Sequence, residues 1–478
     1  MKLIFDVSDK PKAGQLVVFA LQQMLAILAA TIAVPLIIGN GLTPAAAMFG
    51  AGVGTIVYIL FTKRKSPVFL GSSFAFLGSM AAAFAGGVSM QLGMLGLIIG
   101  ALFAGLVYVV IAIVVKFVGV GWLNKLMPAV VIGPTVAIIG LSLAGNAVGD
   151  LLKGDVTKQV TEYVVSTDSG TPEIIETVSN VPVGSSYVAL VCGLITLAVV
   201  MLCSAYGKKT LRLIPFIIGI LAGYAVAAIF TVIGNICDID ALKIVDLSVF
   251  SSYMLTDGSI SLKTFVSLPD FSFVSGLKGL KEFDFSYFAT IFVAYVPVAL
   301  VVFAEHVADH KNLSSIIDHD LLEEPGLTRT LLGDGVGSIA GALFGGCPNT
   351  TYGESVACVA ITGNASVITI FAAAIGCMLF SFITPLVAFV DSIPACVMGG
   401  VCIALYGFIA VSGLKMIQDV NLDDNRNLFV VSVILIAGIG GLTLTFGDIT
   451  LTEVAAALIL GILTNVMLSK KKGNADKK

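Results

Sequence analysis

The chain has 478 residues, of which 57% are hydrophobic and 12% are charged, whereas soluble domains have about 45–50% apolar and about 25% charged residues. This composition excludes a water-soluble globule and indicates a polytopic helical membrane protein. The 51 glycines agree with helices that approach one another closely in a bilayer. A net charge of −4 without a basic patch excludes a nucleic-acid binder, so we expect no nucleic-acid partner.

The cysteines and the N-terminus add two further exclusions. The eight cysteines lie almost entirely in apolar runs and form no Cys-x-x-Cys pair, so we expect neither disulfides nor a bound metal. The first twelve residues are too polar to form a cleavable signal peptide. We therefore expect the membrane spans themselves to drive insertion.

Hydropathy predicts an all-α polytopic membrane protein with fourteen transmembrane segments. In chain order these segments are 14–38, 45–63, 67–86, 92–117, 126–148, 186–204, 213–236, 286–312, 328–346, 349–363, 365–390, 393–413, 427–446 and 451–469.

The distribution of Lys and Arg predicts the orientation of these segments. If the N-terminus is cytoplasmic, most of the cations fall in the short inside segments, and all the others fall in two long polar segments, 149–185 and 238–285. Positive charge concentrates in short cytoplasmic loops. We therefore predict that both termini are cytoplasmic, that the long segments face outward, and that 238–285 carries short strands.

Matching features in the two halves predict an inverted repeat of seven plus seven segments. Pro35 lies in the first segment and Pro297 in the eighth, and the third and tenth segments are interrupted at 71–76 and 348–354. Broken segments at corresponding places mark a transporter's binding site, because non-helical backbone at membrane depth survives only where a cavity or protein satisfies it. The alternative is two unrelated flexible helix ends.

Four carboxylates in the predicted spans are candidates for function, because charges at membrane depth are costly. Glu453 can reach the outer interface, which favours a structural role. Glu354 lies on the interrupted tenth segment, which favours a functional role. Glu305 and Asp309 come late in segment 286–312; they are internal if this helix continues, and Glu305 is otherwise a surface side chain.

The segment from Glu305 to His310 has two interpretations. His306 and His310 are four residues apart and could hold a metal, but the metalloprotease motif needs Glu directly after the first His, and Val307 stands there. Glu305 and Asp309 share one helix face, where two ionised carboxylates repel each other and favour a shared proton. The pattern therefore favours a proton-coupling site.

Enzymatic motifs are absent from the sequence. The Gly333-Asp-Gly335 segment resembles the intramembrane aspartyl protease motif only superficially, because Leu331 replaces its first glycine. The sequence contains neither a Walker A motif nor a nucleophile elbow. We therefore expect no enzyme activity and no cofactor other than a driving ion, H⁺ or alternatively Na⁺.

Several motifs resemble the nucleobase/ascorbate transporter family, and within it the bacterial uracil permeases. They extend over nearly the whole chain and comprise Leu21-Gln22, Ala30-Thr31 with Pro35, Gly71-Ser-Ser-Phe-Ala-Phe76, Gly121-Trp-Leu123, Ala304-Glu-His-Val307, Thr350-Thr-Tyr-Gly-Glu354, Leu405-Tyr-Gly407 and Ser412-Gly413.

This resemblance implies a fold of inverted repeats with short antiparallel strands in segments 3 and 10. It implies a core domain at 1–117 and 286–390, a gate domain at 118–237 and 391–469, an extracellular loop at 238–285, and a cytoplasmic tail at 470–478. It also implies a multi-pass protein of the cell membrane and a homodimer through the gate domains.

The resemblance further implies a set of site residues. The carboxylates of Glu305 and Glu354 would accept hydrogen bonds from the base, and the backbone amides of Phe74 and Gly353 would meet its carbonyls. Around them we expect pocket residues at Ala30, Ser73, Tyr352 and Tyr406. Proton coupling is expected at Glu305, Asp309 and His306.

Two departures from the family pattern affect these expectations. The family motif Gln/Glu/Pro-Asn-x-Gly has Ser355 in place of Asn and Ala357 in place of Gly, which leaves local packing open. Four residues after the Glu of segment 8, a well-known relative has a His that helps couple the proton, and here that position is Asp309. We hypothesise that Asp309 takes over this role.

The expected function is import of uracil with protons by alternating access. Purine-type members tend to carry Gln where Glu354 stands, so a xanthine or urate permease is the first alternative. An anion transporter of the same fold is a second, although it would place cations or bare helix N-termini at the site. A non-transporting membrane sensor is a third, and binding without flux would reveal it.

Overall fold

The computed structural model describes residues 3–119, 128–166, 173–252, 260–446 and 449–469. Within these ranges, eight helices are long and apolar enough to cross a membrane: Ala13–Ile38, Pro44–Phe61, Met90–Val118, Ala129–Asp150, Ser186–Tyr206, Pro215–Cys237, Phe285–Ile317 and Ala395–Met416. The chain is thus a mostly helical multi-span protein. The count of fourteen spans stays a prediction, and the Gly121-Trp-Leu123 motif lies outside the described residues.

The chain divides into two compact units. The larger unit comprises 1–143, 265–387 and 405–478, and the smaller comprises 144–264 and 388–404. The predicted core and gate boundaries stay predictions.

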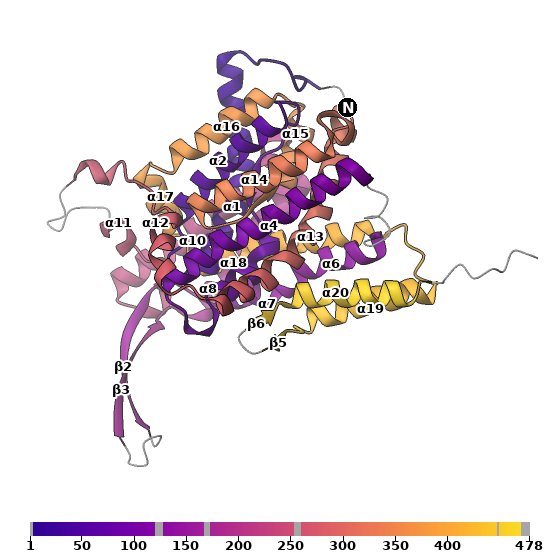
Figure 1. The fold of residues 1–478 in the computed structure, drawn as a ribbon. Helices are drawn as coiled ribbons and strands as arrows, with labels where there is room; N and C mark the ends of the chain where they lie inside the picture. The colour runs from indigo at the N-terminus through magenta and orange to yellow at the C-terminus, as the bar shows by residue number, and fades with distance from the viewer. Residues whose placement is uncertain (1–2, 120–127, 167–172, 253–259, 447–448, 470–478) are drawn as a thin grey trace, which may run out of the picture. The chain divides into compact units, whose positions relative to one another are not determined.

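The larger unit contains most of the helices (Figure 1). Its elements up to residue 317 are α1 (Ala13–Ile38), α2 (Pro44–Phe61), β1 (Leu70–Ser72), η1 (Phe74–Phe76), α3 (Leu77–Ala83), α4 (Met90–Val118), α6 (Ala129–Ser142), α12 (Ser272–Gly276) and α13 (Phe285–Ile317). They are followed by α14 (Leu327–Gly345), β4 (Asn349–Thr351), α15 (Gly353–Thr362), α16 (Val367–Phe380), the first half of α17 (Thr384–Asp391), the later part of α18 (Ala395–Met416), α19 (Asn425–Ile439), β5 (Leu444–Phe446), β6 (Ile449–Leu451) and α20 (Glu453–Met467).

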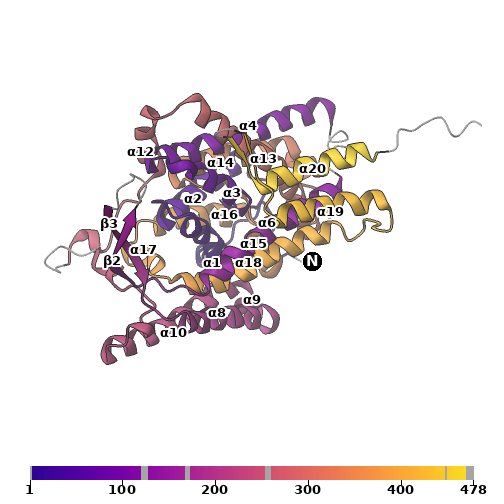
Figure 2. The ribbon, with the colours of Figure 1, turned by 90° about the horizontal axis from the view of Figure 1, so that it is seen from below.

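Small residues let α2, α14 and α4 pack closely. A Cβ atom on Gly54 of α2 would come within 2.7 Å of the carbonyl oxygen of Gly337 on α14, so only glycine fits there. Such close approach is typical of membrane helices, whose association relies on packing rather than on the hydrophobic effect. The three helices lie side by side (Figures 1 and 2), and two of them, α2 and α14, contact the strands β1 and β4.

The two short strands β1 and β4 pair with each other, although almost 280 residues separate them in the sequence. They are antiparallel, with Leu70 opposite Thr351 and Ser72 opposite Asn349. The hydroxyl of Thr55 on α2 accepts the Leu70 N–H at 2.9 Å and donates to the Leu70 carbonyl at 3.1 Å. The free edge of β1 is thereby satisfied inside the protein, as strands at membrane depth require.

Helix α13 (33 residues) extends beyond the predicted segment 286–312, chiefly at its C-terminal end. Asp284 caps its N-terminus by accepting a hydrogen bond from the Tyr287 N–H at 2.7 Å, and the helix ends at Asp318 in the left-handed conformation. Its last turns are anchored by the buried side chains of Leu313 and Ile317. Glu305 therefore lies well inside the helix rather than at its end.

The smaller unit contains α7 (Ala144–Asp150), β2 (Thr157–Ser166), β3 (Glu173–Pro182), α8 (Ser186–Tyr206), α9 (Lys209–Leu213), α10 (Pro215–Cys237), α11 (Ser248–Ser252) and the start of α18. The hairpin of β2 and β3 lies in the first long polar segment. The prediction of strands in 238–285 is wrong for its described residues, which form short helices, with a single isolated bridge between Val266 and Ile383.

Asp155 holds the start of α18 within the smaller unit. Its carboxylate accepts a hydrogen bond from the Ala395 N–H at 3.0 Å, and its own N–H donates to the Ile244 carbonyl. The pKa of Asp155 is raised to about 6, mainly by burial and also by the nearby carboxylates of Asp246 and Asp150, against the lowering effect of the Ala395 hydrogen bond. The Asp155 carboxyl therefore stays protonated to a higher pH in the folded state than in the unfolded chain, where its reference pKa is 3.8.

We expect the thermal stability contributed by Asp155 to be greatest below about pH 4 and to fall as the pH rises through about 6, because ionisation is harder in the folded state. Asp155→Asn should remove this decline and raise the unfolding temperature at pH 7.5. Thermal unfolding of the purified chain at pH 5, 6 and 7.5 measures both, with exposed Asp270→Asn as the control. A parallel pH dependence in wild type and Asp155→Asn would contradict the prediction.

Candidate substrate-binding site

A small cavity in the larger unit is built around the two paired strands. It has a volume of about 50 Å³. Its lining includes six of the predicted site residues, and the full set is Ser73, Phe74, Ala75, Ile139, Glu305, Thr350, Thr351, Tyr352, Gly353, Glu354, Leu405 and Ile409. Elements α6, α13 and α18 thus contribute side chains beside the strand ends.

Two helix starts offer backbone amides to this cavity. Phe74 is the first residue of η1 and Gly353 is the first residue of α15, and neither of these two described starts has a side-chain cap. The first N–H groups of a helix have no partner within the helix. Because both residues line the cavity, their amides are placed to donate to a carbonyl oxygen.

The carboxylates of Glu305 and Glu354 line the same cavity from two elements. Glu305 comes from the middle of α13, and Glu354 comes from the first turn of α15. They are close enough to interact electrostatically with each other and with Asp309. The cavity thus combines carboxylate acceptors with amide donors, as a ligand with alternating N–H and C=O groups requires.

Aromatic residues close the site. Tyr352 is held by a hydrogen bond from its hydroxyl to the Ser72 carbonyl, 2.8 Å long. The ring of Tyr406 on α18 contacts that of Phe74 edge to face, with centroids 5.9 Å apart. Tyr406 thus contacts the lining residue Phe74, and Ala30 is buried on α1, but neither Tyr406 nor Ala30 lines the cavity.

Asp309 lies one turn of α13 beyond Glu305 and is tied to β4. The Thr351 hydroxyl donates to Asp309 Oδ2 at 2.8 Å. Thr351 also lines the cavity and pairs with Leu70 across the strands. The Thr351 side chain therefore links Asp309 to the paired strands β1 and β4.

His306 points away from the cavity into a buried polar network. Its Nδ1 is 2.6 Å from Asp334 Oδ2, and its Nε2 is 3.0 Å from Thr330 Oγ1, both on α14. His310 donates from Nδ1 to the His306 carbonyl and accepts at Nε2 from the Tyr58 hydroxyl at 2.6 Å. All four ring nitrogens are engaged, which argues against the metal interpretation.

Asp334 was missed by sequence reasoning as a candidate. It is fully buried on α14, and only one of its carboxylate oxygens has a hydrogen-bond partner among the described residues. Its position in the middle of the apolar segment 328–346 was the available signal. The Gly333-Asp-Gly335 motif led instead to a comparison with proteases.

Ser355 accounts for one departure from the family motif. Its hydroxyl accepts the Phe69 N–H at 3.0 Å and is hydrogen-bonded by the Gln23 side chain of α1. Ser355 thereby joins α1, α15 and the residue before β1.

Residues 14–176 and 170–446 match a family model described as the permease family. The chain is 36% identical to the uracil permease of Bacillus caldolyticus, over 99% of this chain and 97% of that one. It is 34% identical to the uracil permease of Bacillus subtilis (strain 168), over 98% of this chain and 96% of that one.

Among solved structures, the transmembrane domain of the cyanobacterial bicarbonate transporter BicA is similar in fold. It matches with a TM-score of 0.61 and 13% identity, over 96% of this chain and 100% of that one. This likeness concerns the fold alone, whereas the family match and the two relatives extend over nearly the whole sequence. The chain belongs to the permease family.

Proposed function

We propose that this chain is a secondary active transporter that imports uracil together with protons by alternating access. The observation that carries the proposal is a single cavity whose lining includes Glu305 and Glu354. The same lining includes Gly353, the first residue of α15, and Phe74, the first residue of η1. The edge of uracil alternates N–H donors with C=O acceptors. The carboxylates can accept hydrogen bonds from its N–H groups, while the Phe74 and Gly353 amides donate to its carbonyl oxygens. The permease family and the names of the relatives support a nucleobase substrate and a transporter rather than an enzyme.

The size of the cavity supports a moving site. A volume of about 50 Å³ is small beside the roughly 300–1,000 Å³ of typical ligand pockets. The proposal therefore requires the elements that line the cavity to separate when substrate enters, as alternating access does.

Proton coupling is assigned to Glu305 and Asp309, with His306 as a supporting residue. Glu305 reaches the cavity, and Asp309 lies one turn away with its carboxylate on the Thr351 hydroxyl. A proton shared by these two carboxylates would let the neutral form of Glu305 hold the base, and its loss would favour release. The hydrogen bonds of His306 to α14 give it a role in positioning this part of α13.

The finer architecture is proposed on the same basis. Fourteen segments in two inverted repeats are supported by Pro35 within α1, Pro297 within α13, and the pairing of β1 with β4. Both termini would be cytoplasmic in a cell-membrane protein, and a homodimer through the gate domains follows from the family resemblance. Sodium remains the alternative driving ion.

Uracil uptake into proteoliposomes tests the proposed function. We expect uptake driven by an inward proton gradient, abolished by an uncoupler and unaffected by excess xanthine. Absence of uracil uptake, or its inhibition by xanthine, would contradict the proposal and favour a purine or an anion.

Gly71→Ala should weaken uracil binding without unfolding the protein. A Cβ atom at Gly71 would lie 2.8 Å from the Tyr352 hydroxyl oxygen and closer still to the ring, so Tyr352 must leave its place in the cavity. Overpacking of this kind costs about 1–3 kcal/mol of folding stability. Where that cost is borne by the substrate-bound state, uracil affinity falls by between about fivefold and a hundredfold. Gly407→Ala, where a Cβ meets open space, is the matched control in uracil binding measurements. Equal affinities of the two variants would contradict this steric role.

A further inference from the structure

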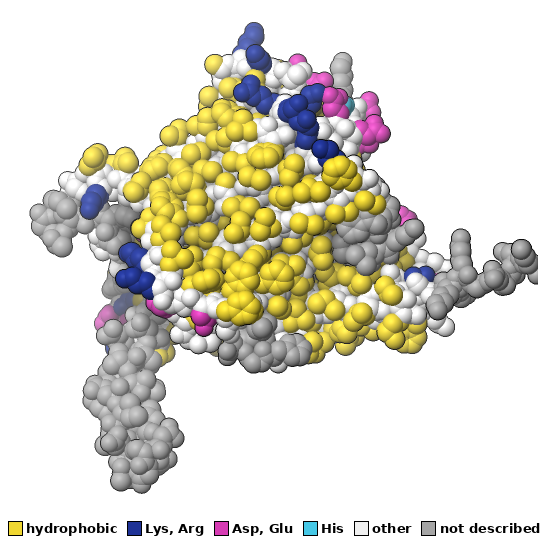
Figure 3. All heavy atoms as spheres, viewed as in Figure 1, with side chains coloured by type: hydrophobic (Ala, Val, Ile, Leu, Met, Phe, Trp, Pro, Cys, Tyr) yellow, Lys and Arg dark blue, Asp and Glu magenta, His cyan; other side chains and the backbone are white. Residues whose placement is uncertain are grey.

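The face of α4 presents a continuous apolar stripe. Large hydrophobic side chains recur at helical spacing along one side, with exposed fractions between 41% and 78%, at Leu102, Leu106, Val110, Ile113 and Phe117. Figure 3 shows the apolar side chains that cover the face over α4 and α14. On a helix of membrane-spanning length such a stripe contacts lipid.

This stripe ends at a groove between α4, the end of α2 and the start of α14. The groove has a volume of about 710 Å³. Phe61, Val115 and Leu332 supply an apolar wall, while Lys116 and Arg329 supply positive charge. The groove thus joins the lipid-facing stripe to two cations at the end of the helices.

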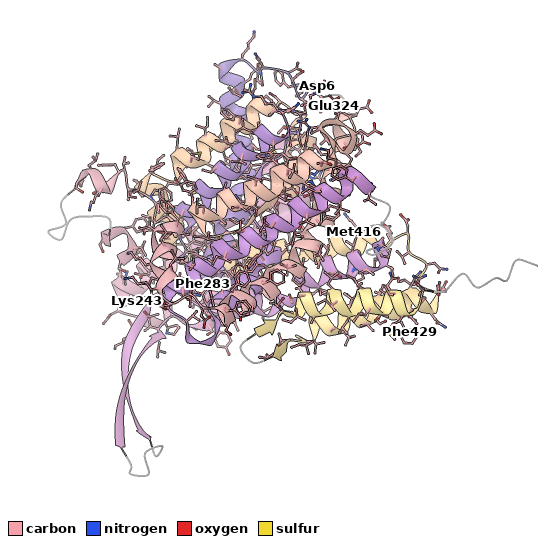
Figure 4. All side chains as sticks on the ribbon, in the orientation of Figure 1. Asp6, Lys243, Phe283, Glu324, Met416 and Phe429 are labelled. Carbon is pink, nitrogen blue, oxygen red and sulfur yellow. The ribbon has the colours of Figure 1, made fainter. Side chains whose placement is uncertain are left out.

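Charged side chains of both signs gather at this end of the larger unit. Figure 3 shows Lys and Arg side chains beyond the edge of the apolar face, with Asp and Glu side chains beside them. Glu324, labelled in Figure 4, lies at this end, and its carboxylate is paired with Lys65. Within the described part of the chain, neither Lys116 nor Arg329 has an ion-pair partner. The ammonium of Lys116 lies 5.7 Å from the ring centroid of Phe117.

Other charged residues in and near the groove also affect its charge. Glu323 lines the groove and adds a negative charge, which Lys116 and Arg329 outnumber. Lys63 and Arg64 follow Phe61 after one intervening residue, Thr62; both are exposed and have positive φ, in a tight turn that directs the chain back toward β1. The lining of the groove therefore carries a net positive charge next to an apolar wall.

We propose that this groove binds an anionic phospholipid, with the headgroup phosphate between Lys116 and Arg329 and an acyl chain along the stripe of α4. Basic pockets beside membrane helices recognise anionic headgroups, and a Lys or Arg near the surface contributes about 1 kcal/mol. The apolar wall complements an acyl chain, which a free phosphate ion lacks. The site is separate from the cavity at β1 and β4, and the inference does not depend on the proposed substrate.

Native mass spectrometry of the purified full chain tests this inference, by titration with phosphatidylglycerol and with phosphatidylcholine of the same acyl chains. Wild type should retain phosphatidylglycerol preferentially. The double variant Lys116→Gln/Arg329→Gln should lose this preference, with apparent affinity about thirtyfold lower for two charges removed. The exposed Lys311→Gln variant is the matched control and should bind as wild type does.

Two results would overturn the inference. One is equal retention of the two lipids by wild type, and the other is unchanged preference in the double variant whose unfolding temperature matches that of wild type. Glycerol phosphate in millimolar excess should not displace the lipid. Displacement at that concentration would instead identify a site for free phosphate and refute the lipid assignment.

Discussion

Glu354→Gln is expected to lower uracil affinity by at least tenfold and to let xanthine compete. Glu354 lines the cavity from the first turn of α15, where its carboxylate can accept hydrogen bonds from ring N–H groups. A glutamine side chain keeps one acceptor oxygen, but its NH₂ group carries two N–H donors, which cannot bond to the N–H groups of the substrate. Hydrogen bonds to charged groups are worth about 1.5–3 kcal/mol, which corresponds to roughly tenfold to hundredfold in affinity.

Binding of radiolabelled uracil to the purified variants, with xanthine as competitor, measures both effects. Exposed Glu282→Gln makes the same chemical change away from the cavity and should behave as wild type. Because a site that hydrogen-bonds a defined edge rejects analogues that lack it, the loss of discrimination is as informative as the loss of affinity. Unchanged affinity and unchanged rejection of xanthine in Glu354→Gln would remove Glu354 from the substrate site.

Sequence reasoning located the interrupted segments but could not derive their pairing. Glycine, serine and proline at 71–76 and 348–354 signal breaks in apolar runs. The register of Leu70 with Thr351 depends instead on how distant helices pack, and on the Thr55 hydroxyl that binds β1 from α2. Local sequence carries no information on such long-range contacts, so the identity of the partner strand came from family resemblance.

Two other features of the structure that the sequence analysis did not predict, the β2–β3 hairpin and the buried Asp334, had signals in the sequence. The hairpin at 157–182 is rich in Val, Ile, Thr and Tyr, which favour strands, whereas strands were expected in 238–285 instead. Asp334 stands alone among apolar residues and small ones, as intramembrane carboxylates with a role do. Its partner, His306, lies 28 residues earlier on another helix, and only the packing of α13 on α14 brings the two together.

Asp309→Asn should uncouple the proton gradient from uracil transport while leaving uracil binding nearly intact. Asp309 is absent from the cavity lining, so the substrate does not depend on its charge. It lies one helical turn from Glu305, and two adjacent carboxylates in a low dielectric favour a shared proton. Asparagine can still accept the hydrogen bond of the Thr351 hydroxyl, so the local structure should persist.

Uptake and counterflow in the same proteoliposomes separate coupling from translocation. A potential of 100 mV acting on one charge supplies about 2.3 kcal/mol, which supports roughly fiftyfold accumulation in wild type. For Asp309→Asn we expect accumulation to fall toward onefold while exchange of internal for external uracil continues. Asp318→Asn makes the same change at the left-handed C-cap of α13, a conformation that asparagine tolerates, and should accumulate uracil normally.

The combination of results distinguishes coupling from a general loss of function. If Asp309→Asn abolished counterflow as well as accumulation, the residue would be needed for substrate movement itself, and the assignment of Asp309 to coupling would be wrong. Full gradient-driven accumulation by Asp309→Asn would also contradict it, because Glu305 alone would then carry the proton. Retained exchange without accumulation is the outcome that a shared proton between Glu305 and Asp309 requires, because only the carboxylate pair would then link translocation to the gradient.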